Sequence, residues 1–229
     1  MNLDESHSWA VSARRGPEIQ RQLAARVVRQ WSGSSVRLVA GADCAYSEGD
    51  SLCAAAVVVW DLEAQEELET TIVCSEIRFP YVPGLFAFRE APAVLKTLQR
   101  LETRPQLLIC DGHGIAHPRR FGLASHVGVL AEIPTIGCAK SRLCGTFADP
   151  GVNRGSSSSI IDRGETVGTV LRTRSGVKPV FVSIGHRIDL ATAEWIILSC
   201  TTCYRLPEPL RLAHRAATES LQQQIGDTG

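Results

Sequence analysis

The sequence predicts an α/β fold in which one mixed central β-sheet carries helices on both of its faces. Three observations support this prediction. The chain has 229 residues, 44% of them hydrophobic, which is enough apolar material for a sizeable core. Three strand-like runs follow one another closely near the N-terminal end. Further along, short apolar strands alternate with helical segments. We expect residues 1–229 to form a single domain.

The N-terminal part of the chain predicts one helix and then an antiparallel meander. Ile19, Leu23, Val27 and Trp31 are spaced four apart behind Pro17, which is typical of an amphipathic helix with proline in its first turn. Polar turns separate the strand-like runs that follow. These runs are Val36–Ala45, Leu52–Trp60 and Leu68–Ile77.

The remaining elements follow in alternation. A helix is predicted from Leu85 to about Leu101, and Pro92 inside it indicates a kink or a late start. The Gly/Ser-rich tract Asp149–Ser159 indicates a surface loop. The other predicted elements are strand Leu107–Cys110, helix Gly122–Ala131, strand Thr135–Ala139, a hairpin of Val167–Arg172 and Pro179–Ile184, helix Leu190–Cys200 and a helix from about Pro209.

Composition and charge exclude several classes of protein. The longest apolar run, Leu52–Trp60, is too short to span a bilayer, and acidic residues precede any apolar stretch at the N-terminus. We therefore expect a soluble, cytoplasmic protein without a membrane partner. Lys plus Arg equal Asp plus Glu at 24 each, which argues against binding nucleic acid through bulk charge but leaves room for a local basic groove. The pair Cys200 and Cys203 lacks a second metal-ligating pair, which favours structural thiols.

Three carboxylates occupy unusual positions. Asp43 lies inside the first predicted strand, where Asp is disfavoured. Asp111 ends a buried strand, and Glu90 lies on the apolar helix that precedes it. The three would meet if the two strands were neighbours. Each acid taken alone is expected to pair with an arginine, but three oxygen donors at one point favour Mg²⁺ or Mn²⁺.

Other polar residues suggest contacts with a phosphate-bearing ligand. Gly112 and Gly114 allow close approach of a ligand to the backbone of the segment DGHGIAHPRRFG. Tyr81 stands between two prolines in FPYVPG, a stiff loop that can hold an aromatic ring outward, although a lone tyrosine more often packs on the core. Lys140 directly follows a buried strand, where a phosphate or solvent can meet it. Arginines that could contact a nucleic-acid backbone are Arg119, Arg120, Arg142, Arg205 and Arg211.

Five blocks of the sequence resemble successive motifs of the endonuclease V family of deoxyinosine-directed repair nucleases. They are GADCAYSEGD, YVPGLFAFRE, DGHGIAHPRRFG, PTIGCAKSRLCGTF and RLPEPLRLAH, in family order from about Val39 to His214. The resemblance implies a ribonuclease H-like fold and a Mg²⁺-dependent DNA repair endonuclease, with Mn²⁺ as a substitute. It implies a nick at the second phosphodiester bond 3′ to a deoxyinosine, by attack of an activated water that leaves a 3′-hydroxyl and a 5′-phosphate. The expected partner is DNA containing deoxyinosine (deaminated adenine), bound by a monomer.

The resemblance also implies roles for individual residues. The metal ligands would be Asp43, Asp111 and Glu90, with Lys140 and His214 completing the catalytic set. Tyr81 matches the wedge that separates the strands. Residues that match the pocket for the lesion base are Gly84, Phe86, Gly112, Gly114 and Leu143. No role is assigned to His113.

Three other functions stay open. The first is a non-catalytic module that binds nucleic-acid lesions, which has no need of three converging acids. The second is a ribonuclease specific for inosine in single-stranded RNA. The third is a zinc hydrolase built on His113, His117 and the cysteines, but two glycines and Pro118 argue against the helix that would pair these histidines.

Overall fold

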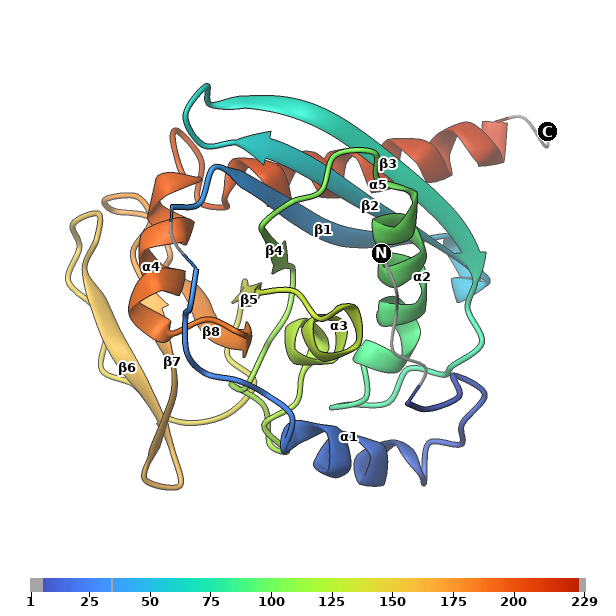
Figure 1. The fold of residues 1–229 in the computed structure, drawn as a ribbon, viewed down its shortest axis with the longest axis horizontal. Helices are drawn as coiled ribbons and strands as arrows, with labels where there is room; N and C mark the ends of the chain where they lie inside the picture. The colour runs from blue at the N-terminus through green and yellow to red at the C-terminus, as the bar shows by residue number, and fades with distance from the viewer. Residues whose placement is uncertain (1–5, 34, 227–229) are drawn as a thin grey trace.

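A computed structural model describes residues 6–33 and 35–226, and these form one mixed eight-stranded sheet with five α-helices (Figure 1). The strand order is β3-β2-β1-β4-β5-β8-β7-β6. The strands are β1 (Leu38–Tyr46), β2 (Leu52–Asp61), β3 (Glu66–Glu76), β4 (Leu107–Cys110), β5 (Thr135–Ala139), β6 (Ser157–Asp162), β7 (Glu165–Leu171) and β8 (Val180–His186). The helices are α1 (Gly16–Ala24), α2 (Ala87–Arg100), α3 (Leu123–Ala131), α4 (Leu190–Ser199) and α5 (Glu208–Gly226).

The N-terminal meander forms as predicted. Strands β1, β2 and β3 pair antiparallel, and β2 is almost entirely buried because its run of Ala and Val is covered on both faces. A short 3-10 turn, Glu48–Asp50, joins the first two strands. The outer strand β3 carries four glutamates and two threonines and is mostly exposed or half-buried, which suits an edge strand.

The register between β1 and β4 brings two of the predicted acids together. These strands run parallel, and Ala42 pairs with Cys110. Asp43 and Asp111 are the next residue on each strand, so they lie at neighbouring positions where β4 ends. The amide of Asp111 still donates to the carbonyl of Ala42 at 3.0 Å, which fixes this alignment. The prediction that the two strands are neighbours is confirmed.

Helices cover both faces of the sheet, as the sequence predicted. Helices α2 and α3 pack on one face, whereas α4 and α5 pack on the other, where α5 runs behind β1–β3 in Figure 1. The start of α5 lies directly against β1: a side chain at Gly41 would place its Cβ 2.3 Å from the backbone of Pro209. Only glycine permits this close approach, which brings the following turns of α5 over Asp43.

Two sequence predictions differ from the structure. The first helix ends at Ala24, before Val27 and Trp31, because the chain leaves the helix to bond with the end of β8: the amide of Arg187 donates to the carbonyl of Val28 at 2.7 Å. The last three residues of the tract predicted as a loop begin strand β6, which pairs with β7. This strand needs no apolar pattern because it is an exposed edge. Helix α2 begins at Ala87 rather than at Leu85 and contains Pro92, which agrees with the kink or late start that the sequence predicted.

No helix among residues 6–33 and 35–226 has both the length and the apolar character needed to cross a bilayer.

Candidate active site

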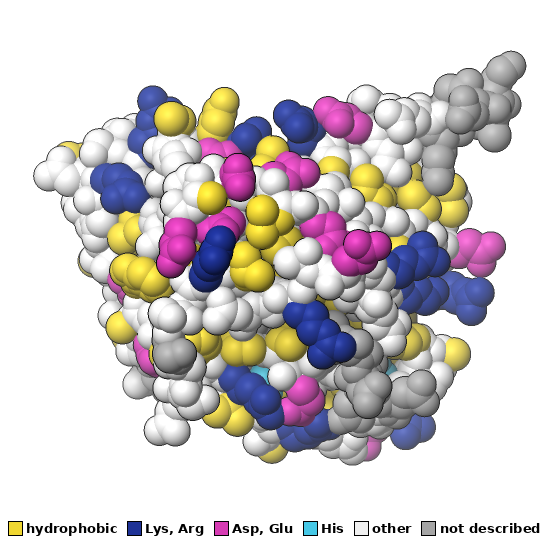
Figure 2. Space-filling view, turned by 45° about the horizontal axis from the view of Figure 1, so that its top comes forward, with side chains coloured by type: hydrophobic (Ala, Val, Ile, Leu, Met, Phe, Trp, Pro, Cys, Tyr) yellow, Lys and Arg dark blue, Asp and Glu magenta, His cyan; other side chains and the backbone are white. Residues whose placement is uncertain are grey.

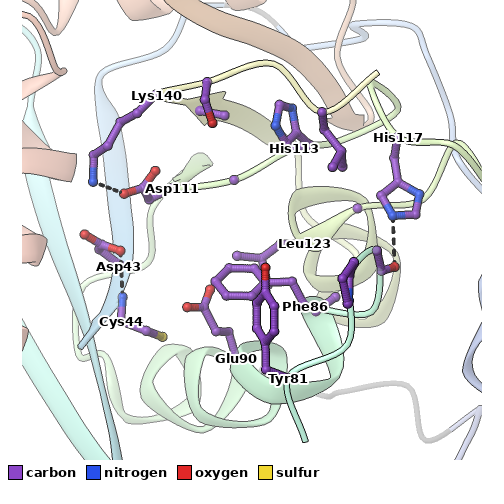
Figure 3. A pocket seen from close by; sticks show the side chains of 18 of the residues that line it. Asp43, Cys44, Tyr81, Phe86, Glu90, Asp111, His113, His117, Leu123 and Lys140 are labelled. Atoms are coloured by element: carbon purple, nitrogen blue, oxygen red, sulfur yellow. Dashed lines mark hydrogen bonds and ion pairs between the residues drawn. The ribbon is translucent and has the colours of Figure 1, made fainter. Parts of the chain in front are cut away.

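A cavity of about 470 Å³ opens where β1, β4 and β5 end, beside the N-terminal end of α2 (Figure 3). It collects most of the predicted site residues from segments far apart in the sequence. The predicted residues that line it are Asp43, Tyr81, Gly84, Phe86, Glu90, Asp111, Gly112, Lys140, Arg142, Leu143 and His214. Such a concave site with a few convergent polar groups is the usual form of a ligand site.

Asp43 is held in this cavity by two hydrogen-bonding partners. The residue is only 7% exposed. Oδ1 accepts the amide proton of Cys44 at 2.8 Å, and Oδ2 lies 2.7 Å from Nδ1 of His214 on α5. Burial, and then the charge of Asp111, raise the pKa of Asp43 from 3.8 to about 6. The carboxylate form is therefore held at a cost, which a positive charge in the cavity would offset.

Glu90 approaches from the opposite side of the sheet, on α2. It is 3% exposed, and its Oε1 accepts the hydroxyl proton of Tyr46 at 2.6 Å. Burial raises the pKa of Glu90 well above its ordinary value, against the effect of the Tyr46 hydrogen bond, and the charges of Asp43 and Asp111 add to the rise. The three acids thus share one electrostatic neighbourhood although they come from different faces.

Lys140 forms an ion pair with Asp111 (Figure 3). Partial burial alone would lower the pKa of Lys140, but the hydrogen bond and charge of Asp111 outweigh it and raise that pKa above 10.5. The ammonium group is therefore charged at neutral pH. The guanidinium of Arg205 fixes the strand end that carries it, because Nη2 donates to the carbonyl of Lys140 at 2.8 Å.

Each of the three carboxylates contacts a polar side chain, and the three do not converge on a common point. Among the residues that the structure describes, no three His, Cys, Asp or Glu side chains are grouped closely enough to hold a metal ion as they stand. Asp43 contacts His214, Asp111 contacts Lys140, and Glu90 contacts Tyr46. Three acids with hard oxygen donors, two of them with raised pKa, nevertheless have the chemistry that suits Mg²⁺.

The predicted wedge and pocket residues surround the rest of the cavity. Tyr81 is 66% exposed, so it stands out from the core as the stiff proline-flanked loop suggested. Phe86 and Leu143 supply apolar walls, and Gly112 supplies backbone. Gly114 lies outside the lining: its Cβ would fall 1.9 Å from the carbonyl oxygen of Ile184, so the glycine is needed for packing against β8.

One backbone carbonyl fixes the end of the Tyr81 loop. The oxygen of Gly84 accepts from Nε2 of Gln20 at 3.0 Å and from Nη2 of Arg119 at 2.6 Å, and Nε2 of His117 lies 3.0 Å away. The other ring nitrogen of His117 accepts from the amide of Arg119, so neither nitrogen is open to a metal. Burial lowers the pKa of His117 to about 4, which keeps the ring neutral at physiological pH.

Sequence reasoning missed two of these residues, Tyr46 and Gln20. Tyr46 could have been found, because strand alternation places it on the same face as Cys44, toward the helix that carries Glu90. Gln20 is a buried polar residue on the apolar side of α1, and only its partners across the fold reveal its place.

The predicted phosphate-binding arginines have separate surroundings. Arg142 lines the cavity and donates to the carbonyl of Gly145 at 3.0 Å. Arg120 pairs with Asp162 and Glu165, and Arg211 pairs with Glu208. On the face drawn in Figure 2, Lys and Arg side chains are interspersed with Asp and Glu and form no continuous band.

His113 and the paired cysteines remain without an assigned role. Nδ1 of His113 is buried without a partner among the described residues, and burial lowers the pKa of this ring to about 4. Cys200 is buried, Cys203 is exposed, and both are free thiols.

Comparisons with known proteins agree on one family. The family model for endonuclease V matches residues 21–215. The endonuclease V of Roseiflexus sp. (strain RS-1) is 50% identical over 218 residues, which cover 94% of this chain and 97% of the relative. The crystal structure of endonuclease V from Streptomyces avermitilis superposes with a TM-score of 0.91 at 41% identity, covering 98% of this chain and 100% of the other.

A third comparison concerns a structure with nucleic acid. Endonuclease V of Ciona intestinalis, solved in complex with a 24mer DNA containing an inosine followed by a ribo-adenosine, has a TM-score of 0.80 and 30% identity, covering 90% of this chain and 95% of the other. These likenesses, with the mixed sheet, confirm the predicted ribonuclease H-like fold. The chain therefore belongs to the endonuclease V family.

Proposed function

We propose that this protein recognises deoxyinosine in DNA and hydrolyses the second phosphodiester bond on its 3′ side, leaving a 3′-hydroxyl and a 5′-phosphate. One observation carries the proposal: two buried carboxylates with raised pKa, Asp43 and Glu90, lie beside the Asp111–Lys140 pair in one cavity. A protein that only bound nucleic acid would gain nothing from holding these acids together at such a cost.

Asp43, Asp111 and Glu90 are the residues that would hold a divalent cation, with Mg²⁺ as the expected ion and Mn²⁺ as a substitute. The fit lies in their chemistry: all are oxygen donors, and mutual repulsion contributes to the raised pKa of two of them. When bound, the cation would neutralise charge on the phosphate and make a water molecule more acidic. His214, which contacts the carboxylate of Asp43, keeps that carboxylate oriented toward the cavity.

Lys140 acts on the phosphate itself. Its ammonium group is charged and lies at the cavity wall, held by Asp111 on one side and by the Arg205-anchored backbone on the other. A cation held in this way stabilises the negative charge that builds up on the phosphate as the attacking oxygen arrives. Lys140 therefore acts mainly on the charge of the transition state, and Asp111 holds its ammonium group in place.

Lesion choice comes from extrusion of the nucleotide. A deaminated purine pairs weakly, so flipping it out costs less than the few kcal/mol, on the order of 2–4, that a normal pair demands. The cavity of about 470 Å³ offers apolar walls at Phe86 and Leu143 and backbone groups near Gly84 and Gly112 to receive the base. The exposed Tyr81 would fill the gap that the flipped nucleotide leaves in the DNA double helix.

The first experiment is cleavage mapping on a labelled DNA strand with one deoxyinosine, run with Mg²⁺ and with a chelator. The matched control strand carries adenine at the same position. We expect one Mg²⁺-dependent nick, at the second bond 3′ to the lesion. Asp43→Ala and Asp111→Ala should abolish this nick while binding survives, and Arg100→Ala, an exposed residue far from the cavity, should not change it.

The same assay includes inosine in matched RNA, because the Ciona intestinalis relative was solved with an inosine followed by a ribo-adenosine. A cut in RNA alone would replace the DNA proposal with an inosine-specific ribonuclease. No cut in either strand would leave the non-catalytic lesion binder. Monomeric state, action in the cytoplasm and one domain for the whole chain stay predictions, to be checked by light scattering, cell fractionation and limited proteolysis.

A further inference from the structure

A second hollow, also of about 470 Å³, lies beside the end of the Tyr81 loop and outside the catalytic cavity. Its lining residues are Arg21, Pro118, Arg119, Arg120 and Arg163. These residues come from α1, from the loop after β4 and from the turn between β6 and β7. The fold thus gathers four guanidinium groups from three distant segments, and none of the lining residues is acidic.

Two of these arginines keep their charge uncompensated. Arg120 is neutralised by Asp162 at 2.8 Å and Glu165 at 2.6 Å, and Arg163 lies 3.9 Å from Asp162. In contrast, Arg21 and Arg119 pair with no carboxylate among the described residues.

Arg119 is held by neutral groups only. Its Nε donates to Gln20 at 2.5 Å and its Nη2 donates to the carbonyl of Gly84. Burial, and then the neighbouring charge of Arg21, lower the pKa of Arg119. Both guanidinium groups line one hollow without a carboxylate partner in the described part of the chain, which favours an anion between them, so the hollow has the electrostatics of an anion site.

The position of the hollow relative to the acids indicates which part of the nucleic-acid strand could supply the anion. In Figure 3 the Asp43–Asp111–Lys140 group lies on one side of the catalytic cavity and His117 lies on the other. Arg119 follows His117 by two residues and contacts the Gly84 carbonyl that closes that side. The hollow therefore lies beyond the base pocket, away from the acids.

We propose that this arginine hollow binds a backbone phosphate on the 5′ side of the flipped nucleotide. The inference rests on the proposed function, because the cut bond lies 3′ to the lesion and occupies the acids. A strand that passes the base pocket must then continue across the hollow in the 5′ direction. A phosphodiester carries one negative charge and two free oxygens, which match the planar fork of a guanidinium. Such a contact positions the strand without reading its bases.

The test measures binding of labelled oligonucleotides in chelator, with inosine or adenine at one position, at several salt concentrations. The variants are Arg21→Ala, Arg163→Ala and the double variant, and both arginines are exposed. The matched control, Arg100→Ala, removes the same charge at the far end of α2, about 20 Å from its start for 14 residues. We expect the double variant to bind roughly tenfold more weakly to both oligonucleotides and to show a salt slope shallower by about one to two.

Substrates shortened on one side locate the contact. The loss in the double variant should disappear with oligonucleotides that begin at the lesion nucleotide and carry no 5′ phosphate, and it should persist when the 3′ side is shortened. Unchanged affinity and salt slope, or a loss that follows the 3′ flank, would overturn the proposal. Failure of the proposed function looks different: wild-type protein would then neither cut the inosine strand in Mg²⁺ nor prefer it in binding, whatever the arginine variants do.

Discussion

Replacing Asp43 by asparagine should stabilise the metal-free protein at neutral and alkaline pH while abolishing cleavage. The new side chain would keep the shape of the old one and an oxygen that accepts from the amide of Cys44. Its amide group can still face Nδ1 of His214. What the substitution removes is a buried negative charge next to Asp111. The wild-type residue would thus be kept for its charge rather than for folding.

The size of the effect follows from the pKa of Asp43, which burial and Asp111 raise from 3.8 to about 6. Between these pH values the folded protein holds a proton that the unfolded chain has lost. Stability therefore falls as pH rises through this window. At about 1.36 kcal/mol per pH unit, the loss reaches about 3 kcal/mol above the window. Asparagine removes this loss, so Asp43→Asn should be more stable by about that amount near pH 8 and nearly equal near pH 4.

Thermal unfolding in the presence of a chelator measures this difference in stability between Asp43→Asn and the wild-type protein. A chain of this size gains about 2–4 °C per kcal/mol, so Tm should rise by roughly 6–12 °C near pH 8. Adding Mg²⁺ should raise Tm of the wild-type protein more than that of Asp43→Asn, because the ion binds the charged carboxylate. An equal or lower Tm for the variant near pH 8, or an offset that does not change with pH, would refute the reasoning.

Three further predictions concern the chemistry, the wedge and the packing. Lys140→Met should lower the single-turnover cleavage rate by about 10²–10³ with little change in substrate affinity, since the lysine acts on charge in the transition state; an unchanged rate would remove it from the mechanism. Tyr81→Ala should leave the free energy of unfolding within about 0.5 kcal/mol, because the side chain is exposed, yet reduce the preference for inosine over adenine duplexes in a binding assay; equal preference would contradict the wedge. Gly114→Ala should destabilise the protein by about 3 kcal/mol in urea unfolding, because its Cβ would lie 1.9 Å from the oxygen of Ile184, and wild-type stability would show that β8 can move aside.

Two free cysteine thiols near the acids do not act as metal ligands. Cys44 and Cys110 are buried beside the acids, and burial and neighbouring groups raise the pKa of both thiols. They stay protonated at working pH and do not compete with carboxylates for Mg²⁺.

The sequence by itself determined most strands, most helix positions and the three acids, because these depend on local pattern. An apolar run bounded by polar turns predicts β2, and the position of Asp111 directly after the buried residues of β4 marks a strand end. The short exposed strand β6 gave no such signal, since an edge strand pairs through its backbone and not through apolar side chains. The first helix was predicted too long because Val27 and Trp31, its last two apolar positions, pack against the core cluster that β8 helps to form rather than on the helix.

Only the tertiary structure decided which groups contact one another. His214 meets Asp43 across 171 residues of sequence, and Gln20 reaches Gly84 across 64. The tertiary structure also gives neighbouring arginines different partners: Arg120 pairs with two carboxylates, whereas Arg119 contacts neutral groups. Periodicity reports which face of a strand or helix is buried, but not what lies against that face. Those contacts follow from strand register, helix packing and the desolvation of charge, which exist only once distant segments are brought together.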